Sequence, residues 1–133
     1  MQSLFTSIKP PDEPDDLAYL RACITSWRDA GFRAVSINGP SEIKKLRELD
    51  IGVEFVGLPV DGKPRIGEFL LATRESGARF AGIINSDCKI VGYPDLVAGI
   101  EANLAGTVIL AWRLDMTDGL PSGQRGGCVG TYI

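Results

Sequence analysis

The stretch Phe80-Ala81-Gly82-Ile83-Ile84-Asn85-Ser86-Asp87 indicates the fold class of this chain. Its first five residues are apolar and do not alternate with polar ones, which is typical of a strand buried on both faces of a parallel sheet. Polar residues follow at once, so we expect the strand to end at about residue 85. Because ligands of α/β sheets bind outside the carboxyl ends of the strands, residues 85–87 are candidate ligand-binding residues.

Strand and helix patterns alternate on both sides of this stretch. Further strands are expected at residues 3–8, 33–38, 53–58 and 107–112, and helices are expected to begin near Pro14, Ser41, Ile66 and Pro94. This alternation predicts a three-layer α/β domain with a mostly parallel, Rossmann-like sheet. We expect strand 80–85 to be central in that sheet, between strands 3–8 and 107–112.

The expected domain spans residues 1–118. The stretch Ser122-Gly123-Gln124-Arg125-Gly126-Gly127 is small and polar, which predicts a loop or a frayed end. Residues 119–133 are therefore expected to form a flexible or partner-bound tail.

The first helix is expected to bury one face. Leu17, Leu20, Ile24 and Trp27 recur at helical spacing after the start signal Pro14-Asp15-Asp16. We therefore expect Trp27 to pack in the core, and we expect Cys23, which lies near the same face, to be a buried thiol.

Composition excludes several classes of function. The 133 residues include no histidine, so a Ser-His-Asp or Cys-His nucleophile and a His-ligated zinc site are excluded. A formal net charge of −3 gives no basic field for nucleic acid or an anionic membrane. No stretch approaches the roughly 20 apolar residues of a membrane span, and we expect no signal peptide. Because Cys23, Cys88 and Cys128 form no C-x-x-C pair, we expect a reduced, cytoplasmic chain.

Standard nucleotide-binding motifs are missing. The first strand is followed by Lys9-Pro10-Pro11, which has no glycine, so the dinucleotide fingerprint G-x-G-x-x-G is not present there. Neither a P-loop nor the nucleophile elbow G-x-S-x-G occurs in the chain. The remaining candidate is the polar end of strand 80–85.

Asn85 and Asp87 are candidate metal ligands. Residues i and i+2 of a strand point to the same side, so the pair can offer two hard oxygens to one cation. Mg²⁺ and Mn²⁺ prefer oxygen ligands, and Mg²⁺ is usually held by one or two carboxylates together with substrate phosphates. The alternative is that both side chains only satisfy backbone groups of a tight turn.

Four segments together resemble a known family. They are Phe5-Thr6-Ser7-Ile8, Ser26-Trp27 on the first helix, Val35-Ser36-Ile37-Asn38-Gly39 and Ala81-Gly82-Ile83-Ile84-Asn85-Ser86-Asp87. This set resembles the N-terminal half of a GT-A-fold glycosyltransferase, a class that uses nucleotide-diphospho-sugars.

The resemblance implies roles for particular residues. Thr6, Ser7 and Ile8 match the strand end that contacts the nucleotide, and Asn38 matches a polar residue that often contacts the base. Asn85-Ser86-Asp87 stands in place of the D-x-D motif, which binds the metal and the diphosphate, and only its last acid is retained.

Lys63 and Arg65 flank Pro64 in a loop that is expected on the ligand side of the sheet. They could neutralise a diphosphate. The alternative is a solvated turn without a ligand.

The resemblance ends near residue 115, and the family's acceptor-binding half and catalytic base would follow that point. We therefore expect a glycosyltransferase-like protein that binds a nucleotide sugar through Mn²⁺ or Mg²⁺ and transfers little or no sugar alone. No catalytic residue is assigned. The alternative is a non-enzymatic, self-associating or ligand-binding module derived from the same fold. The apolar run 107–112 predicts a homodimer or larger assembly, with Val108, Leu110 or Trp112 at the interface.

Overall fold

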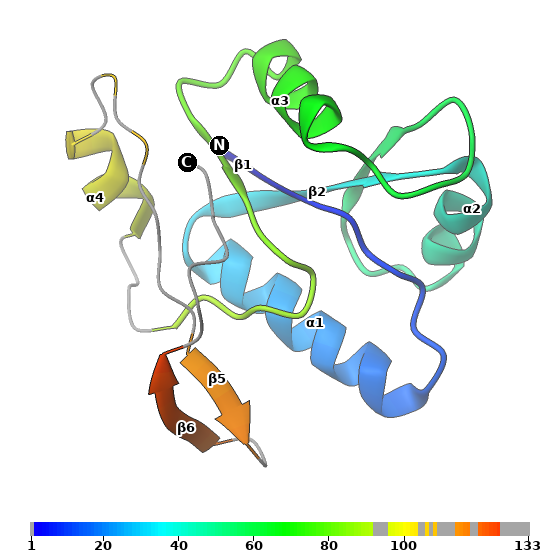
Figure 1. Ribbon diagram of the computed structural model, residues 1–133, viewed down its shortest axis with the longest axis horizontal. Coiled ribbons are helices and arrows are strands. Elements are labelled where there is room, and N and C mark those ends of the chain that lie inside the picture. The colour runs from blue at the N-terminus through cyan, green and yellow to red at the C-terminus, as the bar shows by residue number, and fades with distance from the viewer. Residues whose placement is uncertain are drawn as a thin grey trace.

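The computed structural model describes residues 2–91, 96–103, 106, 108, 114–117 and 120–125. Four strands form one sheet in the order β3-β2-β1-β4 (Figure 1). They are β1 (Gln2–Thr6), β2 (Phe32–Asn38), β3 (Glu54–Gly57) and β4 (Ala81–Ile83). Every pairing in this sheet is parallel, which confirms the predicted fold class.

Helices cover both faces of the sheet. They are α1 (Pro14–Asp29), α2 (Pro40–Glu48), α3 (Ile66–Glu75) and α4 (Leu96–Asn103). Figure 1 shows α1 and α3 on opposite sides of the strands. Among the helices that the structure describes, none is both long enough and apolar enough to cross a membrane.

Two apolar clusters fill the space between the layers. Because successive strand residues point to opposite faces, Leu4 packs in the cluster under α1, and Phe5 packs in the cluster under α3. The first cluster is the larger. It includes Leu20, Cys23, Ile24 and Trp27 of α1, together with Leu46 of α2 and Ile100 of α4. The expected burial of Trp27 and Cys23 is confirmed, since both are 0% exposed.

Side chains of α1 also hold the connection between α2 and β3. The Arg21 guanidinium donates to the backbone oxygens of Leu49 at 2.7 Å and Asp50 at 3.2 Å. Arg28 donates to the backbone oxygen of Gly52. These bonds satisfy carbonyl groups beyond the last turn of α2, where a helix leaves its acceptors without partners.

The strand predicted at 80–85 is shorter in the structure and ends at Ile83. One further ladder bond, from the Ile84 N–H to the Phe5 oxygen at 3.0 Å, follows before the chain turns. β1 is its neighbour, as expected. Within the described sheet β4 lies at an edge. The neighbour expected on its other side, 107–112, lies outside the described residues except for Val108.

The C-terminal region contains a hairpin where a loop or frayed end was expected. β5 (Leu114–Thr117) and β6 (Leu120–Arg125) pair antiparallel as a separate two-stranded sheet. The expectation of a loop at residues 122–127 is therefore wrong for the part up to Arg125. Glycine and proline weaken a strand, but the pairing of Leu114 with Arg125 and of Thr117 with Leu120 supplies the backbone partners.

Two leucines on helices provide a matched test of this core. Leu20 on α1 is 6% exposed, whereas Leu70 on α3 is 56% exposed. Leu20→Ala should lower the free energy of unfolding by about 2–5 kcal/mol, because it removes buried methyl groups and leaves a cavity. Leu70→Ala should change it by only about 0.5 kcal/mol. Urea unfolding followed by far-UV circular dichroism measures both, and equal losses would contradict the burial assigned to α1.

Candidate functional site

The carboxyl ends of the four parallel strands meet at one edge of the sheet (Figure 1). Backbone hydrogen bonds continue past the strand ends. The Leu58 N–H donates to the Asn38 oxygen at 2.9 Å, and the Ile84 N–H donates to the Phe5 oxygen at 3.0 Å. The segments after β1, β2, β3 and β4, which the sequence marked as ligand-binding, therefore lie along one edge, with the segments after β3 and β4 at its two ends.

Asn38 is the centre of a buried polar network at this edge. Its Nδ2 donates to the Ile8 oxygen at 2.8 Å and to Glu42 Oε2 at 2.7 Å, and its Oδ1 accepts from the Ser36 hydroxyl. The Ser36 oxygen in turn accepts the Ile8 N–H at 2.9 Å. Asn38 is 0% exposed. Its amide is occupied in fixing the main chain at Ile8, so in this arrangement it positions the site and does not face a base.

The end of β1 presents mainly backbone to a ligand. Thr6 and Ile8 are buried, and Ser7 is partly exposed. The Thr6 hydroxyl oxygen has no hydrogen-bond partner among the residues that the structure describes. Of the three residues expected to contact a nucleotide, Ser7 is the one whose side chain is accessible.

The start of α2 depends on a residue that the sequence analysis did not identify. The N-cap residue is Gly39, which has no side chain to cap the helix. Asp61, from the loop after β3, replaces that cap. It accepts the Ser41 N–H at 3.0 Å and the Ser41 hydroxyl at 2.6 Å. These two bonds hold the pKa of the Asp61 carboxyl below its ordinary value.

Gly39 is required at this place because the loop approaches it closely. A Cβ added to Gly39 would lie 2.6 Å from Asp61 Oδ1 and 2.7 Å from the Asp61 Cα. Distances this short are incompatible with a side chain unless the loop moves. In the sequence, Asn38-Gly39-Pro40 indicates a turn, but only the fold shows that Asp61 approaches Gly39 there.

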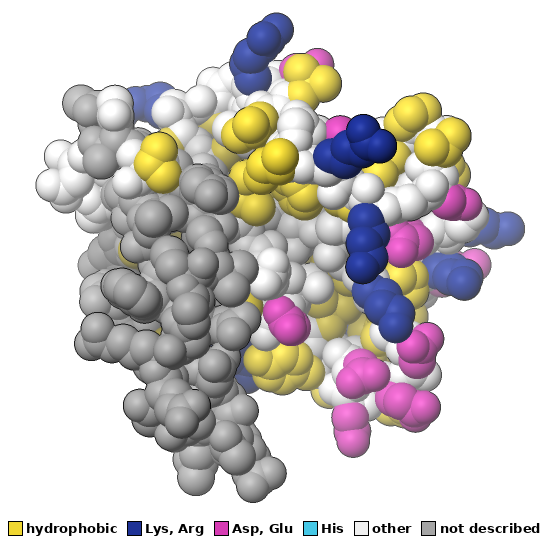
Figure 2. Space-filling model, in the orientation of Figure 1, with side chains coloured by type: hydrophobic (Ala, Val, Ile, Leu, Met, Phe, Trp, Pro, Cys, Tyr) yellow, Lys and Arg dark blue, Asp and Glu magenta, His cyan; other side chains and the backbone are white. Residues whose placement is uncertain are grey.

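Lys63 and Arg65 follow Asp61 in the same loop, and both are exposed. The described residues form two ion pairs, Lys9–Asp12 and Arg33–Glu54, so Lys63 and Arg65 belong to neither. The loop joins β3 to α3. It begins at the carboxyl end of β3, and this is the side of the sheet where a ligand is expected. Figure 2 shows Lys and Arg side chains gathered on this face, between α3 and the acidic start of α1.

Asn85 and Asp87 lie in a tight turn closed by a hydrogen bond from the Cys88 N–H to the Asn85 oxygen at 3.1 Å. Both side chains are exposed. Among the described residues, neither side chain forms a hydrogen bond with a backbone group of the turn. The contact of the Asp87 carboxylate is with its neighbour, the Cys88 thiol, at 3.7 Å. The interpretation that these two side chains merely satisfy the turn's backbone is therefore not supported.

Three side chains of α1 bind the backbone of this turn instead. The Tyr19 hydroxyl donates to the Asp87 oxygen at 2.9 Å, and the Trp27 indole N–H donates to the Cys88 oxygen at 2.8 Å. The Ser26 oxygen accepts the Ile90 N–H at 3.0 Å. The turn is thus fastened to α1 through its backbone, and the Asn85 and Asp87 side chains take no part in these bonds.

The residues present fit a cation only in part. In residues 2–91 and the other described segments, no group of three His, Cys, Asp or Glu side chains could hold a metal ion. Asp87 offers a carboxylate and Asn85 an amide oxygen, which is fewer than the six ligands that Mg²⁺ takes. A cation held by these two residues would need its remaining ligands from phosphate oxygens or water.

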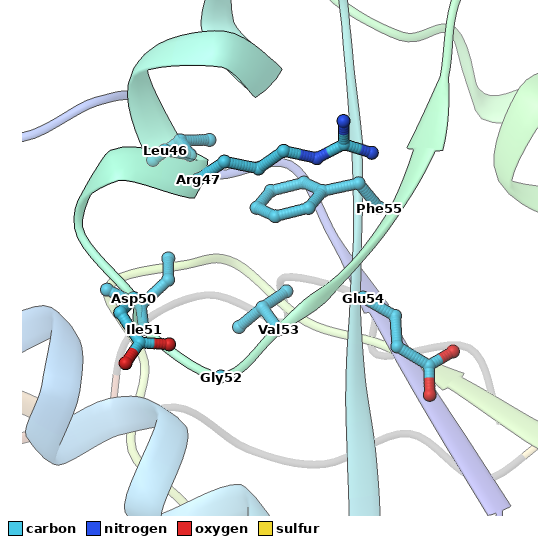
Figure 3. Close-up of a pocket in the computed structure, with 8 residues that line it drawn as sticks. All are labelled: Leu46, Arg47, Asp50, Ile51, Gly52, Val53, Glu54 and Phe55. Atoms are coloured by element: carbon cyan, nitrogen blue, oxygen red, sulfur yellow. The ribbon is translucent and has the colours of Figure 1, made fainter.

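A hollow in the described structure lies elsewhere. It has a volume of about 500 Å³ and lies between the end of α2 and β3 (Figure 3). It is lined by Leu46, Arg47, Asp50, Ile51, Gly52, Val53, Glu54 and Phe55. The Arg47 guanidinium carbon is 6.0 Å from the centre of the Phe55 ring. This hollow is at the amino end of β3, opposite the edge where α/β sheets bind ligands, and none of the predicted site residues lines it.

No protein-family model matches the chain, and no match is found among curated proteins or solved structures. The candidate site is therefore defined by the chain's own geometry. Its parts are the backbone at Ile8, the loop with Lys63 and Arg65, and the exposed pair Asn85 and Asp87.

The Asp61 cap makes a pH-dependent contribution to stability. Its folded pKa lies below the ordinary 3.8, so the stabilisation is complete above pH 3.8 and is lost as the pH falls below that value. Asp61→Ala should lower the melting temperature at pH 7, and the difference from wild type should shrink as the pH falls below 3.8. Ser41→Ala, which keeps the backbone N–H, should show a smaller difference of the same pH dependence. A wild-type advantage that grows in acid would contradict the assigned cap.

Proposed function

We propose that this chain is a glycosyltransferase-like α/β domain that binds the diphosphate of a nucleotide sugar, through Mg²⁺ or Mn²⁺, at the carboxyl edge of its sheet. The observation that carries the proposal is the turn after β4. Its Asn85 and Asp87 side chains are exposed and unused by the turn, while α1 holds the turn's backbone.

The surroundings of the turn favour an anionic ligand with a cation. One or two protein carboxylates plus substrate phosphates is the usual way in which proteins bind Mg²⁺. Lys63 and Arg65, exposed in the loop after β3, can donate charge-assisted hydrogen bonds to phosphate oxygens. At the end of β1, the proposed contacts with the nucleotide are Ser7, which is partly exposed, and the backbone at Ile8, which Ser36 and Asn38 fix by hydrogen bonds.

Sugar transfer by the chain alone is proposed to be slight or absent. Asp87 and Asn85 are proposed to hold the cation, which when bound neutralises the diphosphate leaving group. A transferase also uses a general base, which is typically worth about 10²–10⁴-fold in rate. No residue of this chain is assigned as that base.

Asp87→Ala tests the proposed site. Wild-type chain should be stabilised by UDP or GDP together with Mn²⁺, by about 2.7 kcal/mol when the nucleotide is at about 100 times its Kd. Asp87→Ala should lose this cation-dependent stabilisation but keep its melting temperature without ligand, because the Asp87 side chain holds no backbone group. Differential scanning fluorimetry with and without Mn²⁺ measures both quantities.

Matched variants separate this site from general charge effects. Asp29→Ala removes another exposed aspartate, which is the last residue of α1. This variant should respond to nucleotide and Mn²⁺ as wild type does. Lys63→Ala and Arg65→Ala should weaken the response without abolishing it. If wild type and Asp87→Ala respond alike, the site is wrong.

A second proposed property is self-association, which would also serve a non-enzymatic module. Val108 is 61% exposed, and it belongs to the apolar run whose other proposed interface residues, Leu110 and Trp112, lie outside the described residues. Further apolar side chains are exposed on and next to α3, namely Val60, Ile66, Leu70 and Leu71 (Figure 2). Exposed apolar surface of this kind favours association with another chain.

Sedimentation velocity at micromolar concentration tests self-association. We expect a dimer or larger species for wild type. Val108→Lys should shift it toward monomer, because a charge in an apolar interface is costly to bury. A clean wild-type monomer would reject the assembly.

A further inference from the structure

Cys23 lies on α1, and Cys88 lies in the turn after β4 that hydrogen bonds fasten to α1. Tyr19, Cys23 and Trp27 are four residues apart in succession, so they lie on neighbouring turns along one side of the helix. Tyr19 binds the Asp87 oxygen and Trp27 binds the Cys88 oxygen. Residues 87 and 88 are therefore bound to α1 at two points, and Cys23 is midway between Tyr19 and Trp27 along the helix.

The environment of Tyr19 gives an independent indication. Burial is the main cause that raises the pKa of the Tyr19 phenol. A hydrogen bond with the Cys23 side chain raises this pKa further, and the nearby Cys88 thiol also raises it. One phenol group is thus a neighbour of both thiols. Cys23 is 0% exposed, which is consistent with cover by the turn, whereas Cys88 is partly exposed.

A third contact fixes both backbones. The Ser26 hydroxyl donates to the Cys23 oxygen at 2.6 Å, and its oxygen accepts the Ile90 N–H at 3.0 Å. The segment after Cys88 is therefore tied through Ser26 to the same turn of α1 that carries Cys23. A disulfide requires cysteines on segments that lie close together, and three hydrogen bonds fasten the segment that carries Cys88 to α1.

We propose that Cys23 and Cys88 form a disulfide when the protein meets a peroxide oxidant, and that this bond locks the 85–88 turn onto α1. The peroxide first oxidises the partly exposed Cys88 thiol to a sulfenic acid, and one water leaves. The Cys23 sulfur then attacks the Cys88 sulfur, the S–S bond forms, and the hydroxyl group departs with the Cys23 proton as a second water. Two thiols and one hydrogen peroxide thus give one disulfide and two waters.

This inference rests on the contacts with α1 and not on the proposed function. Its readout is the state of the thiols, which requires neither a nucleotide nor a metal. The disulfide could form in a chain that binds no sugar nucleotide, and a chain that binds one could fail to form it.

The full-length Cys128→Ser variant tests the pair, because only Cys23 and Cys88 remain. After hydrogen peroxide, both thiols should be lost together in a denaturing thiol titration. The intact chain should become about 2 Da lighter, because a disulfide removes two hydrogens, and dithiothreitol should reverse the change. Peptide mapping should find Cys23 joined to Cys88. The oxidised chain should also melt at a higher temperature than the reduced chain, since the cross-link restricts the unfolded state.

Two matched variants complete the test. Cys23→Ser with Cys128→Ser should show no lighter species, and its Cys88 should progress to a sulfinic acid about 32 Da heavier. Cys88→Ser with Cys128→Ser should keep a thiol that peroxide barely oxidises, because Cys23 is buried. If a variant does not fold, peptide mapping of the oxidised wild-type chain still tests whether Cys23 is joined to Cys88.

Three results would overturn the proposal. The first is Cys88 converted to sulfinic acid beside an intact Cys23 in the Cys128→Ser variant. The second is a disulfide between two chains, seen as a dimer on non-reducing electrophoresis. The third is a wild-type map in which Cys88 is joined to Cys128.

Discussion

Burial of the Trp27 indole is the interaction on which the fold and the candidate site both depend. Its ring is 0% exposed in the cluster between α1 and the sheet, while its N–H donates to the Cys88 oxygen at 2.8 Å. A buried tryptophan is stable only where its N–H finds an acceptor. The same side chain therefore stabilises the core and fixes the turn after β4, so α1 cannot move away from the sheet without releasing that turn.

A buried polar network gives the carboxyl edge its second constraint. Burying an amide without partners costs about 1–3 kcal/mol in proteins, and Asn38 avoids this cost by binding Ile8, Ser36 and Glu42. Its bonds join the ends of β1 and β2 and leave little freedom at Ile8. A ligand at this edge would thus meet a backbone that is already ordered, which lowers the entropy lost on binding.

Local patterns predicted the layers of the fold and the core residues of α1. Strand–helix alternation and helical spacing depend on residues close in sequence, and they correctly placed Trp27 and Cys23 inside. The cap on α2 could not be predicted in this way, because Gly39 receives it from Asp61 across 20 residues. For the same reason the sequence assigned Asn38 to a ligand, although its amide is consumed by backbone and side chains that only the fold brings near.

Electrostatics determines how a diphosphate could reach this edge. The chain has a formal net charge of −3, and the first turn of α1 carries Asp15 and Asp16. Asp87 would repel a diphosphate, since like charges at short range disfavour each other. A divalent cation held by Asp87 would offset that repulsion in the proposed site. Lys63 and Arg65, in the loop after β3 at the other end of the sheet, would add positive charge to the same edge. In the proposed site, cation and nucleotide would therefore bind as a unit, and neither would be held well alone.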